Sequence, residues 1–453
     1  MAAVTHALAE FVHSAPSPAA SPRAAEVVRH AVLDLAGVVV AGASEAAGRL
    51  ALDYARSQGG AGAATVFGGR TRLSPSLAAL VNGTAGHALD YDDIGLGAGH
   101  ISVAILPALW AVAEQTRADG AAFTDAVVVA YEIAHRLTTM YSDTRLGPYA
   151  AGYHKPSVYS SLGAAAGCAR LLDLSPGAVA HALGIAASQS GGLRANFGTM
   201  TKPLHAGIAG RTGVEAALLA SSGFTASSEI LEQRFGWHDV ICRAEGDLDV
   251  VLDALDSVGV STPYAVEEGM TFKAYPCCGA NHYAIDGVRN VLRDTGLGES
   301  DVASLDVWIE RRNLEDVLVY PWARTPLEGK FSLAYTVTAA LVDGAVTVET
   351  FTDEALARLA PHRGRVAVHP ATDLPQNGAR IKLVTTAGRT VEHEQLTLRG
   401  SVADPMSWDE LAAKFHANTR GTLSGEAASG AVALIAALPD QPDLTQIGAL
   451  LLG

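Results

Sequence analysis

The sequence is short of positive charge, which argues against several kinds of partner. Its 453 residues include 47 Asp and Glu against 32 Lys and Arg, so the formal net charge is −15. Such a surface repels nucleic-acid phosphates and anionic lipid headgroups, and no basic tract offsets the acids. We therefore expect no nucleic-acid partner and no membrane partner. A buried site for a small ligand stays compatible with this charge, because a few local cations can outweigh the surface.

Cysteine is also scarce. The four cysteines are Cys168, Cys242, Cys277 and Cys278, and their spacing indicates neither a disulfide framework nor a Cys-x-x-Cys redox motif. The first residues show no cationic stretch followed by a long apolar core. No run reaches the ~18 apolar residues that are needed to span a bilayer. These absences favour a soluble, cytoplasmic protein.

Charged residues make up only 17% of the chain, whereas hydrophobic residues make up 49%. This composition is typical of a well-packed globular protein. Because single cores stop growing near ~250–300 residues, a chain of this length predicts two domains.

Hydrophobic periodicity changes once along the chain. Apolar positions recur at three- and four-residue spacing from about residue 24 to residue 266, with Gly, Pro and Ser between the segments. We expect a large all-helical domain over residues 1–266 and a smaller α+β lid domain over residues 267–404. C-terminal helices over residues 405–453 are expected to return to the helical domain, so the predicted fold class is mainly α.

Strand-like alternation supports the α+β assignment of the lid. "SLDVWIE", "GRVAVHP" and "ARIKLVTTAGRTVEHEQLT" alternate as strands do, and the last contains a turn signal near Gly388 that predicts a hairpin. Helical stretches such as "YAIDGVRNVLRDTG" and "SLAYTVTAALVDG" lie between them.

The stretch "HALDYDDIGLGAGH" (residues 87–100) holds three aspartates between two histidines. It could bind a metal ion, but the calcium-loop pattern, a second acidic cluster and a phosphate-binding loop are all missing. Alternatively, Asp92 and Asp93 could be solvent-exposed acids at a helix end. A third interpretation makes the stretch half of an acid–base active site. We predict no metal.

Four other stretches place ionisable groups beside Gly, Pro or Ser within apolar helical sequence. They are "YHKPS", "GTMTKPLHAG", "KAYPCCGANH" and "VLVYPWARTPLEGKFS". Burying such groups costs several kcal/mol unless they have partners, so we expect them to converge on each other or on a ligand. The adjacent cysteines are either packing residues after Pro276, or one of them is a thiol that faces a cavity.

Together, "HALDYDDIGLGAGHISVAILPALWAVAE", "YHKPSVYSSLGAAAG", "MTKPLHAGIAGRTGVEAALLA", "KAYPCCGANHYAIDG" and "LEGKFSLAYTVTAALVDG" resemble the MmgE/PrpD family. The resemblance runs in the same order from about residue 5 to residue 440. It implies a large helical domain with an α+β lid, a homodimer, an active site in the cleft between the domains, and no cofactor. The family includes 2-methylcitrate dehydratase, cis-aconitate decarboxylase and iminodisuccinate epimerase.

The resemblance also implies which residues line the cleft. They are Asp90, His100, His154, Lys202 and Tyr320, while Asp92 and Asp93 take supporting roles. Ile94 stands where cis-aconitate decarboxylases have threonine, and a cysteine replaces an expected histidine in "PCCGANH".

The chemistry of small di- and tricarboxylates suggests roles for these residues. Charge develops on a carbon next to a carboxylate, so cations must face the carboxylates and placed acids or bases must move protons. Lys202, Lys273, His100 and His154 are expected to supply the positive side, and Asp90 to orient a histidine. Cys278 is the candidate lid acid–base group. Lys273, Cys277 and His282 are assigned to substrate binding.

The predicted function is that of a cofactor-independent lyase of a small di- or tricarboxylate, with a 2-methylcitrate dehydratase-like reaction first. The alternatives are an epimerase of an imino- or amino-dicarboxylate and a cis-aconitate decarboxylase-like enzyme. A non-catalytic carboxylate-binding protein is the last alternative.

Overall fold

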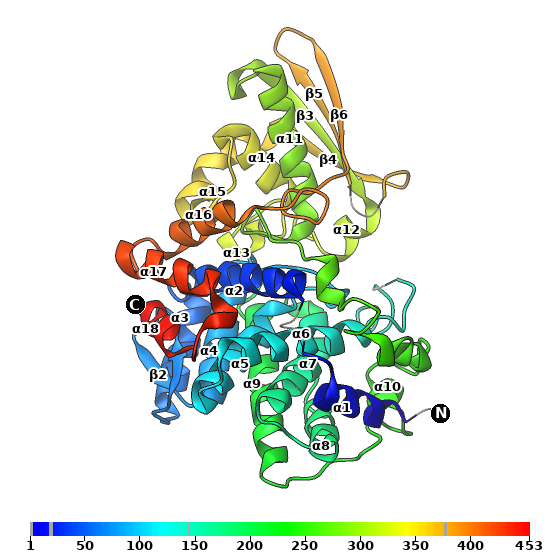
Figure 1. Ribbon diagram of the computed structural model, residues 1–453. Helices are drawn as coiled ribbons and strands as arrows, with labels where there is room; N and C mark the ends of the chain where they lie inside the picture. The colour runs from blue at the N-terminus through cyan, green and yellow to red at the C-terminus, as the bar shows by residue number, and fades with distance from the viewer. Residues whose placement is uncertain (1–2, 18–20, 144, 376–377) are drawn as a thin grey trace.

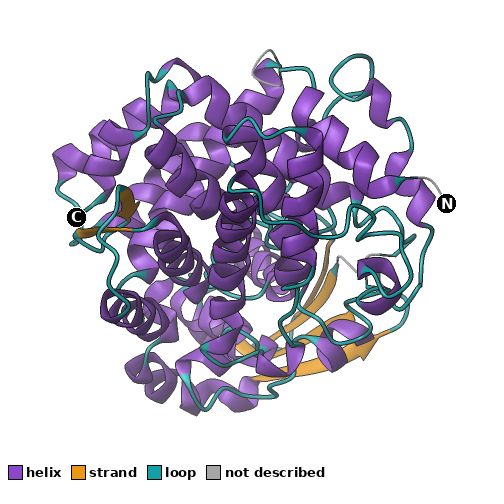
Figure 2. Cartoon of the chain, turned by 90° about the horizontal axis from the view of Figure 1, so that it is seen from below, coloured by secondary structure: helices purple, strands orange, loops and turns teal. Residues whose placement is uncertain are grey.

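The structure is a computed structural model that describes residues 3–17, 21–143, 145–375 and 378–453. Helices dominate it, and the α+β part forms a separate lobe above a larger body of helices (Figure 1). Seen from below, the sheet lies at one edge of the molecule (Figure 2). The prediction of a mainly α fold with a smaller α+β part is confirmed.

Before the lid, the described residues of the larger body form ten α-helices and one small two-stranded sheet. They are α1 (Val4–Ser14), α2 (Pro22–Gly42), α3 (Ala46–Ser57), β1 (Ala64–Val66), β2 (Thr71–Leu73), α4 (Pro75–Ala88), α5 (Ser102–Thr116), α6 (Gly120–Arg136), α7 (Lys155–Leu171), α8 (Pro176–Ala187), α9 (Thr201–Ser221) and α10 (Trp237–Val240).

Two glycines let α4 and α9 approach each other closely. A Cβ atom on Gly83 of α4 would lie 2.8 Å from the Cα atom of Gly207 on α9. A side chain at either position would therefore push the two helices apart. This contact places the first turn of α9, which carries Lys202, next to the loop that follows α4.

The lid is built on a four-stranded sheet of order β4-β3-β5-β6. Its strands and helices are α11 (His282–Thr295), β3 (Val302–Glu310), α12 (Arg311–Asp316), α13 (Pro326–Gly329), α14 (Leu333–Asp343), α15 (Asp353–Leu359), β4 (Val366–Ala371), β5 (Ala379–Thr385) and β6 (Thr390–Gln395). β3 runs parallel to β4 and antiparallel to β5, and β5 and β6 form the antiparallel hairpin predicted around Gly388. A hydrophobic core drawn from residues 275–383 is separate from the core of the larger body, which draws on residues 4–272 and 411–451.

The C-terminal helices lie against the larger body, where they contact α2 and β1 (Figure 1). They are α16 (Trp408–Thr419), α17 (Gly425–Ala436) and α18 (Thr445–Leu451). Lys414 of α16 lies 2.7 Å from the buried Asp34 of α2, and its Nζ donates to the carbonyls of Tyr91 at 3.0 Å and Lys273 at 2.9 Å. This one ammonium therefore ties together α2, the loop after α4 and the segment that enters the lid. The domain boundaries at residues 266 and 404 stay predictions.

No single helix in the described ranges combines the length and the apolar character needed to cross a membrane. α2 and α3 meet these criteria only as a pair, and they are bent by 84° at their junction.

Candidate active site

A pocket of about 200 Å³ is lined by residues of both the helical body and the lid. Its lining includes Asp90, His100, Arg145, Tyr149, His154, Lys155, Phe197 and Lys202 from the body, and Cys278, Arg312, Asp316 and Phe331 from the lid side. His100 lies just before α5, His154 is the N-cap of α7, and Lys202 is in the first turn of α9. Three helix N-termini therefore meet at the pocket, and their dipoles favour a bound anion.

Asp90 is held by two lysines at the inner end of the pocket. Its Oδ2 lies 2.6 Å from Lys202 Nζ, while Lys273 Nζ contacts Oδ1 and donates to the Asp90 carbonyl at 2.8 Å. Burial alone would raise the pKa of Asp90, but the two ammonium groups outweigh burial and hold that pKa well below its ordinary value. Two positive charges thus share one negative charge. Asp90 also has a left-handed backbone, with φ of 52°, which aspartate tolerates better than most residues.

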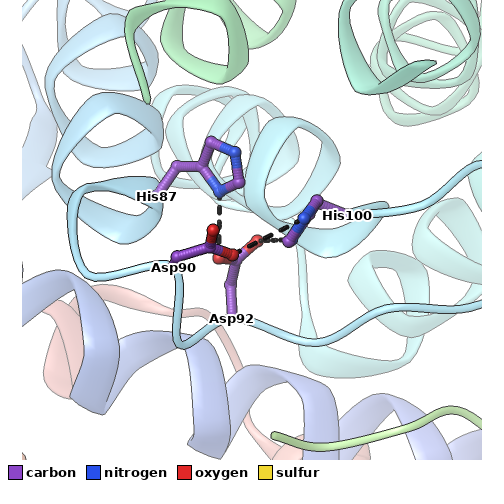
Figure 3. Close-up of side chains that lie close together, drawn as sticks. All are labelled: His87, Asp90, Asp92 and His100. Carbon is purple, nitrogen blue, oxygen red and sulfur yellow. Dashed lines mark hydrogen bonds and ion pairs between the residues drawn. The ribbon is translucent and has the colours of Figure 1, made fainter. Parts of the chain in front are cut away.

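Asp92 lies between two histidines (Figure 3). The Nδ1 atoms of His87 and His100 lie 3.0 and 2.9 Å from its two oxygens, and its side chain is completely buried. Burial would raise the pKa of Asp92, but the two imidazoles lower it well below the ordinary value. An ionised Asp92 fixes both rings with hydrogen on Nδ1. The Nε2 atom of His100, which lies 3.7 Å from Asp90 Oδ1, is then free to accept a proton.

His154 is the second base in the pocket wall. Its Nδ1 lies 3.3 Å from Nδ1 of His205, one turn after Lys202 on α9. Burial lowers the pKa of His154 well below its ordinary value, and the neighbouring His87 and Lys202 lower it further. Burial likewise lowers the pKa of His100. Both rings are therefore neutral near pH 7 and able to accept a proton, and the positive charge comes from lysines instead of from these histidines.

Cys278 contributes a thiol from the lid side of the same pocket. Burial raises its pKa, nearby Asp90 adds to the rise, and the ammonium groups of Lys273 and Lys202 oppose it. The thiol is therefore protonated near neutral pH. The pocket thus combines neutral bases and an ammonium from the helical body with a proton donor from the lid.

Comparison with known families agrees with this two-part arrangement. Residues 6–247 match the model of the MmgE/PrpD N-terminal domain, and residues 275–438 match that of the MmgE/PrpD C-terminal domain. The chain belongs to the MmgE/PrpD family.

Several relatives of the chain are named cis-aconitate decarboxylase. The chain is 28% identical to cis-aconitate decarboxylase of Homo sapiens, over 99% of this chain and 95% of the human protein. It is 29% identical to the Mus musculus enzyme of that name, over 93% of this chain and 88% of the mouse protein. It is also 28% identical to a cis-aconitate decarboxylase-like protein of Aspergillus oryzae, over 86% of this chain and 85% of the fungal protein.

Five of the predicted site residues of this MmgE/PrpD chain line one pocket. They are Asp90, His100, His154, Lys202 and Cys278. They come from four of the five stretches singled out in the sequence, as the expectation of convergence requires.

The structure places the other four predicted residues behind the pocket wall. Lys273 is fully buried and reaches the pocket through Asp90. Cys277 and His282 are also fully buried, and His282 Nε2 lies 3.2 Å from the carbonyl of Cys277. The hydroxyl of Tyr320 donates to the carbonyl of Phe197 at 3.3 Å, which supports a pocket residue from outside.

Two interpretations of the opening stretch need correction. The reading of Asp92 and Asp93 as solvent-exposed acids is wrong, because both are buried. Asp93 accepts a hydrogen bond from the backbone N–H of Ser102, the first residue of α5, at 3.3 Å. Asp90 was expected to orient a histidine, but the closest carboxylate to His100 Nδ1 belongs to Asp92.

Three further residues belong to the site without a role predicted from the sequence. His87 and His205 lie against the site, and Lys155 lines it. A sequence signal existed for His205, since it follows Lys202 by three positions and so shares its helix face. No comparable signal identified His87 as the second partner of Asp92.

The histidines and aspartates of Figure 3 also have the composition of a metal site. One ligand atom from each of His87, Asp90, Asp92 and His100 lies within 4.8 Å of the others. However, both oxygens of Asp90 already contact ammonium groups, and both oxygens of Asp92 accept from imidazoles. A divalent cation would have to displace these partners, so this donor set does not fit a resident metal well.

We predict that the protein loses stability when the pH falls from 7 to 5. Burial lowers the pKa of His87 to about 4 and that of His282 to about 3. Below pH 6.5 the unfolded chain takes up protons at both residues and the folded chain does not. The free energy of unfolding should therefore fall by about 1.4 kcal/mol per pH unit for each histidine.

Urea unfolding at pH 7, 6 and 5 would measure this loss. A His282→Phe variant should show a shallower dependence on pH, whereas His6→Gln, at a side chain that is 63% exposed, should not. Equal pH dependence in all three proteins would contradict the prediction.

Proposed function

We propose that this chain is a cofactor-independent lyase that acts on a small di- or tricarboxylate by acid–base chemistry. The observation that carries the proposal is the charge of the pocket. Among the lining residues, four cationic side chains (Arg145, Lys155, Lys202 and Arg312) stand against two carboxylates (Asp90 and Asp316) in a chain of net charge −15. Arg145 is also paired with Asp143 and Glu310, so Lys155, Lys202 and Arg312 are the cations that remain to face a ligand. A substrate with two or three carboxylates would complement these cations.

The residues at the inner end suit a reaction that builds charge next to a carboxylate. The ammonium of Lys202 would stabilise this charge, because Lys273 already helps to neutralise Asp90. Cys278 would deliver a proton to carbon. His100 or His154 would remove a proton where the reaction requires it.

Two lyase reactions fit this set. Decarboxylation of an unsaturated tricarboxylate needs only charge stabilisation and a proton donor, and the names of the relatives support testing it first. Dehydration of a 2-methylcitrate-like hydroxy acid, which sequence analysis ranked first, needs a base and an acid together. Ile94 stands where cis-aconitate decarboxylases have threonine, but this difference is compatible with decarboxylation. The backbone of Ile94 pairs with that of Thr271, and Ile94 is not among the pocket-lining residues.

Epimerisation is the second candidate function. It needs acid–base groups on two faces of one carbon, and Cys278 lies on the lid side while His154 and Lys202 lie on the helical side.

Proton NMR in D₂O tests these alternatives with the purified protein, EDTA and a panel of acids. The panel contains cis-aconitate, 2-methylcitrate, citrate, iminodisuccinate and simple hydroxy-dicarboxylates. We expect consumption of cis-aconitate with release of CO₂, or vinylic signals from a hydroxy acid. Loss of an α-proton signal without a new compound would favour the epimerase. Turnover only after a divalent ion is restored would contradict the proposal and assign a metal to the cluster of Figure 3.

A further inference from the structure

Lys155 is a cation in the pocket wall that forms no ion pair with the residues that the structure describes. It is the first residue of α7, and its neighbours His154 and Pro156 line the pocket with it. Its Nζ donates to the carbonyl of Gly97 at a long 3.4 Å and lies 5.2 Å from the centre of the Tyr149 ring. Within the described ranges, the contacts of this Nζ are with the Gly97 carbonyl and the Tyr149 ring, and neither is a carboxylate.

The other cations that adjoin the pocket are either paired or exposed. Arg312 lines the pocket from the lid, and its side chain is exposed to solvent. Lys202 and Lys273 share Asp90. Arg145 pairs with Asp143 at 2.9 Å and with Glu310 at 3.4 Å. A half-buried ammonium without such a partner is costly, unless a ligand supplies the missing charge.

Lys155 and Lys202 belong to different parts of the pocket wall. Lys202 contacts Asp90 and lies near the rings of Phe197 and Phe331, whereas Lys155 contacts Gly97 and Tyr149. These two sets of neighbours do not overlap. His154 lies between them, because it adjoins Lys155 in the chain and packs against Phe197 at 5.2 Å.

We propose that Lys155 binds the carboxylate of the substrate that is remote from the reacting carbon, and that it thereby makes the site selective for acids with at least two carboxylates. This inference rests on the proposed function and specifies how its substrate is recognised. One carboxylate faces Lys202 at the inner end, the other pairs with Lys155, and the reacting carbon lies near His154 and Cys278.

The protonation behaviour of Lys155 agrees with this role. Burial lowers its pKa to about 8, an effect that Asp143 opposes and that nearby Arg145 and Arg194 support. An added carboxylate would restore the ammonium and stabilise it.

Binding of glutarate and of its monoamide, glutaramate, tests the proposal without requiring turnover. The two probes differ by one carboxylate. Thermal shift and calorimetric titration would compare the wild-type protein with Lys155→Met. Lys382→Met is the matched control, because it removes the same charge from β5 of the lid, outside the pocket.

We expect the wild-type protein and Lys382→Met to prefer glutarate over glutaramate by about 10-fold or more, and Lys155→Met to lose that preference. A Lys155→Met protein that keeps the full preference would overturn the inference alone. A wild-type protein that binds neither probe would overturn the inference and remove the support for a carboxylate substrate. Binding of glutarate in a protein that turns over no acid of the NMR panel would leave the inference standing and contradict the lyase.

Discussion

Replacing Lys202 with methionine is expected to lower kcat/KM by about 10²- to 10³-fold with little loss of stability. The ammonium of Lys202 is the pocket cation closest to Asp90, and it is the one available to charge that develops on the substrate. Methionine keeps the length of the side chain. Asp90 would retain Lys273, so no buried carboxylate would be left without a partner.

Steady-state kinetics and thermal unfolding of the same preparations would separate rate from stability. Lys273→Met is the matched comparison, since it removes the other ammonium from the same carboxylate but lies outside the pocket lining. We expect Lys273→Met to cost more stability, about 1–3 kcal/mol, because it also leaves the buried carbonyl of Asp90 without its donor. A Lys202→Met protein with near wild-type kcat/KM would show that this lysine is structural.

The sequence predicted the secondary structure well where the signal was local. The hairpin of β5 and β6 follows from alternation around one glycine turn, and the long helices follow from uninterrupted periodicity. The convergence of five stretches on one site was predicted from their unusual polar residues. These features depend on near neighbours in the chain, which a sequence displays directly.

Burial and pairing within the site were harder to predict. Asp90, Asp92 and Asp93 are alike in sequence, yet one pairs with lysines, one with histidines and one with the start of a helix. These partners come from α4, α5, α9 and the lid, and their meeting depends on the close packing of helices such as α4 and α9. Which partner each aspartate contacts is therefore determined by tertiary packing, which the local sequence does not display.

The two adjacent cysteines illustrate the same limit. The sequence leaves open which of the two thiols faces a cavity, because the turn after Pro276 can present either residue. The structure buries Cys277 in the lid core and places Cys278 in the pocket wall. The backbone N–H of Cys278 donates to the carbonyl of Lys330 at 3.0 Å, which fixes the orientation of the turn.

This orientation makes the two cysteines a matched pair for mutation. Replacing Cys278 with alanine is expected to lower kcat by about 10²- to 10⁴-fold, because a proton donor next to the reacting carbon is lost. KM should change little, since the cations that bind the carboxylates remain. Solvent deuterium should no longer enter the product on a single face.

Cys277→Ala should behave in the opposite way. Its thiol is completely buried among apolar lid residues, so its loss should cost about 1 kcal/mol of stability and leave kcat nearly unchanged. NMR of the product formed in D₂O, together with thermal unfolding, would measure both effects. If Cys278→Ala kept wild-type kcat and stereospecific labelling, the proton would have to come from an imidazole or ammonium of the helical body. A folded Cys277→Ala protein without activity would instead support the assignment of that cysteine to the substrate.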